Sequence, residues 1–359
     1  MERYEHGGNI YAHPECVDFS ANLNPLGMPR AAREALASCA SACAAYPDPQ
    51  CGELVAALAA YEDVVHDWVL PCAGATDAFT RICLALRPAH ALVCAPCYSG
   101  YEQALEVVGA RVVRHCLRPN EGFEVTERLA QSLRTPVEVA FVANPNNPTG
   151  RCVQRDVLTA CLDRAAEQGI VMVLDECFVD LTLSPGSNDL LGRYPNLVIV
   201  KALTKTFCLA GLRVGYLMCG SAELVARLRQ VGQPWAVSVP AQLAGMAALR
   251  EKGYVARSRT FVARERVRLL RAIDACGLHV VPGEANYLLF EGARGMYEEL
   301  LDCGILVRPC DNYQGLGERW LRVAVRTSTE NDRLIRALSR INADGTALDT
   351  SAVGAQERS

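Results

Sequence analysis

The chain has 359 residues, half of them hydrophobic, and a net charge of −4. This length exceeds one typical domain, so we expect a large core divided between unequal parts. The acidic balance argues against nucleic acid as a partner, because proteins that bind phosphate polymers usually carry a basic surface.

The N-terminus and the cysteines indicate the compartment. The segment MERYEHGGNIYAHPE has no apolar stretch like that of a secretory signal, and no later segment has the roughly 18 uninterrupted apolar residues of a membrane span. The 17 cysteines are odd in number and scattered, which indicates reduced, mostly buried thiols. Cys94 and Cys97 form a CxxC pair without a second pair, so packing is favoured over a metal site. We therefore expect a cytoplasmic protein without a membrane partner.

Short apolar runs alternate with helical stretches between about residues 70 and 220, which predicts an α/β fold with a mostly parallel sheet covered by helices. The expected strands are residues 91–95, 110–116, 137–143, 170–176, 197–202 and 213–219. Several lack polar alternation, as strands buried on both faces do. In such sheets the ligand lies at the carboxyl ends of the strands, where we find residues 144–150, Asp175 and Lys205.

From about residue 252 the pattern changes to a long helix, short strands and two further helices, near 294–303 and after 329, which indicates a smaller α+β domain. In the long helix, the charges from Arg257 to Arg271 alternate with apolar residues and indicate a solvated face. We expect an N-terminal arm with part of the small domain (1–45), a large α/β domain (46–251), a small C-terminal domain (252–342) and a disordered tail (343–359).

Two segments near strand ends can face a ligand of the large domain. Residues Gly74, Ala75, Thr76 and Asp77 open a helical stretch, where backbone N–H groups and the Thr76 hydroxyl can hold a phosphate. Tyr98 follows the strand at 91–95 and can stack on a flat ligand, although a core position is equally consistent. Each motif alone is weak.

Residues 144–150, NPNNPTG, follow the strand at 137–143. They form either a simple turn or a rigid loop that points the Asn147 amide at a ligand. Asp175 ends an apolar run, and a carboxylate there needs a partner because an unpaired buried charge costs on the order of several kcal/mol. A protonated pyridine nitrogen is one such partner. An arginine, or a role in capping the next turn, is the alternative.

Lys205 follows the strand at 197–202, where a lysine without a functional role is unusual. Partial desolvation would lower its pKa and leave a nucleophilic amine that can form an imine with an aldehyde. Taken alone, a surface lysine is the simpler interpretation. Arg213, eight residues later, can hold a phosphate with two hydrogen bonds, and Asp175 lies thirty residues earlier, so the combination favours a cofactor site.

The order PNNPTG, LDE and TK-x7-R resembles the fold type I pyridoxal phosphate enzymes, in particular the aminotransferase group that includes the histidinol-phosphate aminotransferases. A closer resemblance is to the threonine-phosphate decarboxylases of cobalamin biosynthesis. It rests on HGGNI (6–10), DFSANLNPLG (18–27), ALTK with GLRVGY, and VRPCDNYQGL with LRVAVR. The likeness extends from about residue 6 to residue 341 and implies this fold for nearly the whole chain.

The resemblance implies roles for the matching residues. Lys205 would hold pyridoxal 5′-phosphate covalently, and Asp175 would pair with the ring nitrogen. Asn147 and Tyr98 would contact the ring, Asn147 also the substrate. The residues implied to bind the cofactor phosphate are Gly74, Ala75, Thr76 and Arg213. Tyr46 would reach the cofactor phosphate of a neighbouring subunit, which implies a homodimer with shared active sites.

The resemblance also implies a small phosphorylated amino acid as substrate. Arg322 matches the family's carboxylate-binding arginine and Arg308 matches a second arginine, and which anion each receives is left open. His6, Gly7 and Asn22 match substrate-binding positions of the decarboxylases. Without the cofactor context, a mobile N-terminal arm and exposed arginines are the simpler interpretation.

Two positions depart from the family pattern. Phe178 stands where many aminotransferase relatives have a tyrosine, and phenylalanine cannot donate that hydrogen bond to the ring oxygen. Ala202 replaces a common hydroxyl residue, so one phosphate contact is missing unless Thr204 supplies it.

The resemblance implies decarboxylation of threonine phosphate to aminopropanol phosphate. The alternative is the reaction of the histidinol-phosphate aminotransferases, since the two reactions share the cofactor site and differ in the bond broken at Cα. A remote alternative is a regulatory protein that binds the cofactor without turnover, against which the complete set of Lys205, Asp175 and Asn147 argues.

Overall fold

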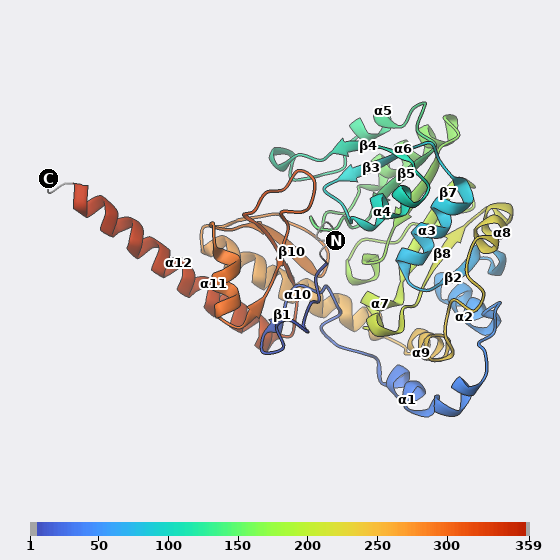
Figure 1. The fold of residues 1–359 in the computed structure, drawn as a ribbon, viewed down its shortest axis with the longest axis horizontal. Coiled ribbons are helices and arrows are strands. Elements are labelled where there is room, and N and C mark those ends of the chain that lie inside the picture. The colour runs from blue at the N-terminus through green and yellow to red at the C-terminus, as the bar shows by residue number, and fades with distance from the viewer. Residues whose placement is uncertain (1–5, 357–359) are drawn as a thin grey trace.

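The computed structural model describes residues 6–356, with side chains up to residue 342. Its larger part is built on a seven-stranded sheet covered by helices, and its smaller part contains a four-stranded sheet (Figure 1). The α/β fold with a mostly parallel sheet and a smaller α+β part is therefore confirmed. None of the described helices has both the length and the apolar character needed to cross a bilayer.

The large sheet has the strand order β2-β8-β7-β6-β5-β3-β4. Its strands in chain order are β2 (Val69–Cys72), β3 (His90–Ala95), β4 (Arg111–Cys116), β5 (Val139–Ala143), β6 (Val171–Asp175), β7 (Leu197–Ala202) and β8 (Gly215–Cys219). β8 runs antiparallel to β2 and β7, and the other neighbouring pairs are parallel. All six expected strands belong to this sheet. β2 was not expected, because it is short and contains a proline.

Both faces of the sheet are buried under helices. One face is covered by α3 (Ala75–Leu86), α4 (Gly100–Val107) and α8 (Ala222–Gln230), the other by α2 (Gly52–Glu62), α6 (Arg155–Glu167) and α9 (Val239–Leu249). Successive residues of a strand point to opposite faces, so Val198 and Val200 of β7 pack in one cluster and Leu197 and Ile199 in the other. This double cover explains why the strands lack polar alternation.

The remaining elements of the large part are short. They are α1 (Arg30–Ser38), α5 (Arg128–Ser132), α7 (Leu203–Thr206) and the 3-10 turns η2 (Ala40–Ala44), η3 (His66–Trp68), η4 (Pro119–Glu121), η5 (Val179–Leu181), η6 (Asn188–Leu190) and η7 (Ala210–Leu212). All 17 cysteines are free in the structure, and most of them are buried, as the sequence led us to expect for packing residues.

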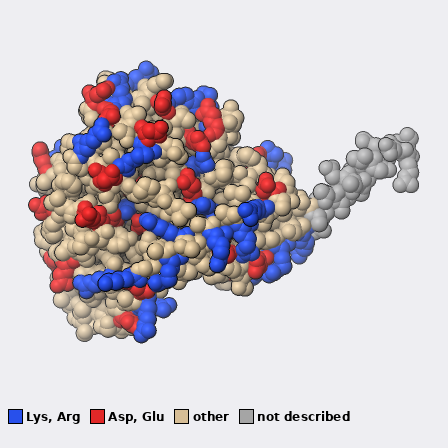
Figure 2. Space-filling view, turned by 180° about the vertical axis from the view of Figure 1, so that it is seen from behind, with Lys and Arg blue, Asp and Glu red and all other residues tan. Residues whose placement is uncertain are grey.

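The smaller part contains an antiparallel sheet of strand order β12-β13-β10-β9. Its strands and helices are β9 (His279–Val280), β10 (Tyr287–Glu291), β12 (Arg308–Pro309), β13 (Trp320–Ala324), α10 (Tyr254–Ala275), α11 (Met296–Asp302) and α12 (Ser328–Gln356). In α10, Arg257, Arg264 and Arg271 are exposed whereas Val262 and Leu269 are buried, which confirms the predicted amphipathic helix. Seen from behind, basic side chains form a band near the middle of the molecule (Figure 2).

The two chain ends extend this smaller part. β1 (Val17–Asp18) pairs in parallel with β11 (Ile305–Leu306), and Phe19 is buried in the core of the small domain. At the other end α12 continues to Gln356 and projects from the body, where the sequence suggested a disordered tail from residue 343 (Figure 1). Residues 357–359 of that tail lie outside the described residues.

A buried ion cluster lies under the carboxyl end of β7. Lys201 points to the same face as Ile199, and its Nζ lies 2.8 Å from Glu62 Oε1 and 3.3 Å from Asp180 Oδ1. All three side chains are almost fully enclosed. Tyr216 donates a further hydrogen bond to Glu62. Lys201 thus supplies the cation that both carboxylates contact.

We expect Lys201→Met to lower the free energy of unfolding by about 3–5 kcal/mol, because it leaves two buried carboxylates without their shared cation. Urea unfolding followed by circular dichroism measures this change. As a control, Arg30→Met removes an exposed ion pair with Glu34 and should cost less than about 1 kcal/mol. Equally small losses in both variants would contradict the importance of the cluster.

Candidate active site

The carboxyl ends of the large sheet and the small domain enclose a cavity of about 190 Å³. The predicted residues that line it are His6, Gly7, Asn22, Ala75, Thr76, Tyr98, Asn147, Asp175, Thr204, Lys205, Arg213, Arg308 and Arg322. Phe178 and Ala202, the two departures from the family pattern, line it as well. The fold therefore gathers residues from the N-terminal arm, from the carboxyl ends of β2, β3, β5, β6 and β7, and from the small sheet into one site.

One end of the cavity is the N-terminus of α3. Gly74 precedes this helix with φ of 86°, and it has no side chain to cap the first N–H groups. A Cβ atom on Gly74 would lie 2.9 Å from the Arg213 guanidinium, and one on Gly215 would lie 3.1 Å from the Ala75 nitrogen. Because Gly74 and Gly215 have no side chains, the N-terminus of α3 and the Arg213 guanidinium can lie close together. This arrangement suits a phosphate group.

The other end is marked by Asp175, the last residue of β6, which is 9% exposed. Tyr101 donates its hydroxyl to Oδ2 at 2.5 Å, and the Cys177 N–H donates to Oδ1 at 2.9 Å. Burial raises the pKa of Asp175, whereas these hydrogen bonds lower it. Because both donors are neutral, a cation beside the carboxylate would stabilise its charge further, as a protonated ring nitrogen does.

Lys205 lies on α7, the single helical turn that follows β7. Burial lowers its pKa, and the nearby cations Arg322 and Arg213 lower it further. Its Nζ is 5.8 Å from the centroid of the Phe178 ring. A lowered pKa increases the neutral fraction of the amine, which is the form that reacts with an aldehyde.

The loop at 144–150 is tied to the same strand end. The Asn144 N–H donates to the Asp175 carbonyl at 2.8 Å. The Asn147 amide lines the cavity and accepts a hydrogen bond from Arg322, which also donates to the Ser20 carbonyl at 2.8 Å. The loop thus presents Asn147 between the sheet and the small domain.

Arg308 and Arg322 are direct cross-strand partners in the antiparallel pair β12 and β13. Side chains at such positions lie on the same face, with Cβ atoms about 4.5–5.5 Å apart. Both are buried and both line the cavity. The small sheet therefore places the two arginines side by side at the cavity, where Arg308 contacts Asn312 and Arg322 contacts Asn147.

The cavity carries a strong excess of positive charge. Lys205, Arg213, Arg308 and Arg322 line it, with Asp175 as a carboxylate among its lining residues. Such a site favours ligands with several negative charges.

His6 lines this cavity from the N-terminal arm. Its ring centroid lies 5.7 Å from that of Tyr98. Burial lowers the pKa of His6, and Arg308, Lys205 and Arg322 lower it further. The imidazole is therefore mainly neutral near pH 7 and contributes hydrogen bonds rather than charge.

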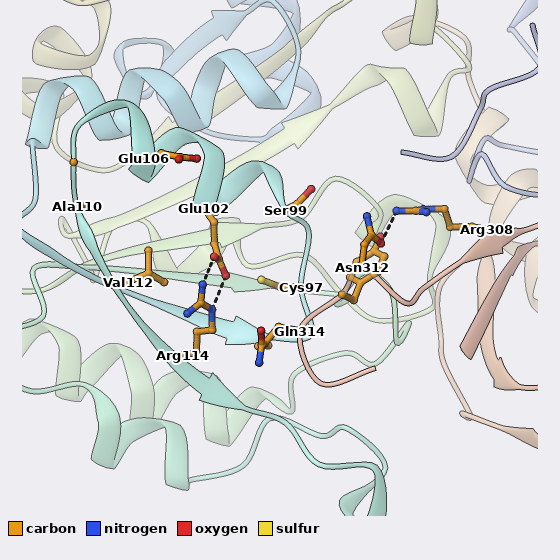
Figure 3. Close-up of a pocket in the computed structure, with 13 residues that line it drawn as sticks. Cys97, Ser99, Glu102, Glu106, Ala110, Val112, Arg114, Arg308, Asn312 and Gln314 are labelled. Atoms are coloured by element: carbon orange, nitrogen blue, oxygen red, sulfur yellow. Dashed lines mark hydrogen bonds and ion pairs between the residues drawn. The ribbon is translucent and has the colours of Figure 1, made fainter. Parts of the chain in front are cut away.

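A second cavity, of about 430 Å³, shares Arg308 and Tyr313 with the first. Its outer wall includes the ion pair between Glu102 and Arg114, and Arg308 faces Asn312 at 2.8 Å on its inner side (Figure 3). Arg308 therefore lies at the boundary between the inner site and a larger outer space, whereas Arg322 lies beside Asn147.

Tyr46 is the predicted residue that lies away from this cavity, all predicted site residues being among those described. It is 80% exposed, and its ring stacks on Trp235 with centroids 4.8 Å apart. Such a position leaves it free to contact another molecule. Its role towards a neighbouring subunit stays a prediction.

Sequence reasoning missed Tyr101 and Cys177. Tyr101 follows Tyr98 by three residues, a spacing that places two side chains on one side of a helical turn, and this was the available signal. No sequence signal indicated Cys177, because the chain has 17 cysteines and nothing in its residue type sets this one apart.

The residues fit the pyridoxal phosphate that the sequence resemblance implies. The glycine-lined N-terminus of α3 and Arg213 suit its phosphate, the Lys205 amine suits its aldehyde, and the buried Asp175 suits its ring nitrogen. Phe178 supplies no hydroxyl, as the sequence indicated, while Thr204 and Thr76 do line the cavity.

Comparisons with known proteins agree with this fit. The sequence pattern of the aminotransferase class I and II family matches residues 14–338. The threonine-phosphate decarboxylase of Salmonella typhimurium is 34% identical over 94% of this chain and 96% of its own. Histidinol-phosphate aminotransferase 1 of Cupriavidus pinatubonensis is 33% identical over 90% of this chain and 88% of its own. The crystal structure of the histidinol-phosphate aminotransferase from Clostridium acetobutylicum superimposes with a TM-score of 0.85 at 25% identity, covering 91% of this chain and 99% of that one.

We expect Tyr101→Phe to raise the pKa of Asp175 further, because it removes a donor that favours the ionised carboxylate. Pyridoxal phosphate binding needs that charge, so its loss on acidification should begin at higher pH, by about one unit for a hydrogen bond of about 1.5 kcal/mol. Equilibrium dialysis against pH measures the shift. Tyr194→Phe, which removes a hydroxyl bonded to the distant Asp163, is the matched control and should leave the profile unchanged. Identical profiles for both variants would refute the role of Tyr101.

Proposed function

Because the chain belongs to the class I and II aminotransferase family, whose members use pyridoxal 5′-phosphate, we propose that it decarboxylates threonine phosphate. The observation that carries this proposal is the cross-strand pair Arg308 and Arg322. A small amino acid that bears both a carboxylate and a phosphate presents two anions at a short, defined separation. The similarity to the Salmonella decarboxylase over nearly the whole chain supports the same reaction.

Bound pyridoxal phosphate supplies an electron-accepting ring for the bond that breaks at the substrate Cα. Asp175 holds negative charge at the ring nitrogen, and Tyr101 and the Cys177 N–H fix the direction of this carboxylate. Lys205 would hold the cofactor, and its side chain, once released and protonated, would supply the proton that Cα needs in place of the lost carboxylate. Burial and the nearby Arg322 and Arg213 lower the pKa of Lys205, which makes its amine a better proton donor than an exposed lysine.

We assign the two substrate anions from the positions of the arginines. Arg322 donates to Asn147, the residue that the resemblance assigns to the cofactor ring, so we assign the substrate carboxylate to Arg322. Arg308 lies at the boundary with the outer cavity and receives the phosphate, together with His6. Two arginines and a neutral imidazole supply the donors that a zwitterion with a phosphate requires.

The similarity to histidinol-phosphate aminotransferases supports a second candidate. The outer cavity of about 430 Å³ beyond Arg308 offers space for a larger substrate. Histidinol phosphate carries a phosphate and no carboxylate, whereas the glutamate that supplies the amino group carries two carboxylates, so the paired arginines are compatible with both candidates. The similarity to the Salmonella decarboxylase over 94% of this chain favours the decarboxylase.

We expect the purified holoenzyme to release carbon dioxide from threonine phosphate without any keto acid and to form aminopropanol phosphate. Mass spectrometry and a carbon dioxide assay measure the products, and Lys205→Ala should abolish both. Glutamate-dependent amino transfer to imidazole-acetol phosphate, without carbon dioxide from threonine phosphate, would establish the aminotransferase instead.

We expect Arg308→Gln to raise KM for threonine phosphate about 30-fold or more, because it removes a buried charge from a paired anion. The variant should also lose competitive inhibition by inorganic phosphate, whereas Arg322→Gln should retain it. If Arg308→Gln keeps this inhibition and Arg322→Gln loses it, the two assignments are reversed.

A further inference from the structure

Asn24 lies beneath the turn that carries Lys205 and outside the cavity that the cofactor would fill. It is 2% exposed. Its backbone N–H donates to the Lys205 carbonyl at 3.2 Å, and its side-chain amide donates to the Thr206 carbonyl at 2.8 Å. The same amide donates to the Ser258 hydroxyl of α10 at 2.7 Å. One side chain thus ties the lysine turn to a helix of the small domain.

The Lys205 turn depends on such outside contacts. α7 has four residues, and a single helical turn is not stable by itself. Its last carbonyl groups have no partner within the helix, as at every helix end. Asn24 supplies two of the missing donors from a segment about 180 residues earlier. On the opposite side, Thr206 donates its hydroxyl to Asp180 at 3.4 Å, which connects the turn to the buried ion cluster.

The same short segment also reaches the substrate arginine. Ser20 accepts a hydrogen bond from Arg322 at 2.8 Å, and Asn22 lines the cavity. Asn24 follows two residues later. Residues 20–24 therefore contact Arg322 at one end and the Lys205 turn at the other.

We propose that Asn24 is a positioning residue, which fixes the direction of the Lys205 amine in the cavity and links it to the segment that holds Arg322. It touches neither the cavity nor the reacting atoms, so it acts through the backbone of residues 205 and 206. A small displacement of this turn changes the reach of the lysine amine towards both ends of the cavity. The proposal rests on the cofactor site alone and applies equally to a decarboxylase and an aminotransferase.

The test compares Asn24→Ala with Ser258→Ala, a matched control. Ser258→Ala removes the other partner of the Asn24 amide and leaves the donation to Thr206 intact. Two quantities are measured for each protein: the dissociation constant of pyridoxal phosphate from the apoenzyme, and the pH midpoint of the absorbance band of the lysine-bound cofactor. Neither needs turnover, so the result does not depend on the substrate.

We expect Asn24→Ala to weaken cofactor binding about tenfold or more and to move the pH midpoint, because misplacement of a reacting group by about 1 Å has large effects. Ser258→Ala should leave both quantities near wild type, even if both variants lower Tm equally. Wild-type values in Asn24→Ala, or equal changes in the two variants, would overturn the proposal.

A second variant covers the case in which Asn24→Ala does not fold. Asn24→Asp keeps the volume of the side chain and replaces its two N–H donors by an acceptor. We expect the same loss of affinity and the same displaced midpoint. Wild-type cofactor binding with an unchanged midpoint in Asn24→Asp would reject the role of the amide.

Discussion

The buried negative charge of Asp175 is the constraint on which the site depends. β6 lies between β5 and β7, with Asp175 opposite Ala143 on one side and Val200 on the other. The segments that leave these two neighbours therefore begin beside the carboxylate, and they are the 144–150 loop and the turn that carries Lys205. Neutral donors hold the carboxylate in place and the charge of Lys205 also lowers its pKa, so a cationic ligand beside it would stabilise its charge further.

Two lysines four residues apart show how the sheet separates structure from chemistry. Lys201 points to the face opposite the cavity, where burial lowers its pKa but the carboxylates of Asp180 and Glu62 raise it more, so it stays charged. Lys205 lies beyond the strand among other cations, and burial with Arg322 lowers its pKa. The first stabilises the fold as an ammonium ion, and the second is available as an amine. Thr206 joins the two environments through Asp180.

The sequence predicted the parts of the site that follow local rules. Apolar runs located the strands, and the polar residues at their ends located Asp175, Lys205 and the 144–150 loop, because parallel strands end at one edge. Tyr101 had only its three-residue spacing from Tyr98 as a signal, and Asn24 was not singled out, since both roles depend on contacts across the fold and neither side chain is charged. β2 was not predicted, because a run of four residues that includes a proline is too short to show the hydrophobic periodicity of a strand.

The choice between the two reactions lies in the small domain and the N-terminal arm rather than in the cofactor end. Both candidate activities use the same aspartate, lysine and phosphate site. These residues therefore predict the cofactor but do not determine which bond at Cα is cleaved. That bond is selected by the posture of the substrate at Cα. The residues available to set this posture are Arg308 and Arg322, which strand register makes cross-strand neighbours, and the arm that brings His6 to the cavity wall and Ser20 against Arg322. Under the proposed function, a substrate with two anions would span both arginines at once, and two contacts restrict rotation about Cα more strongly than one.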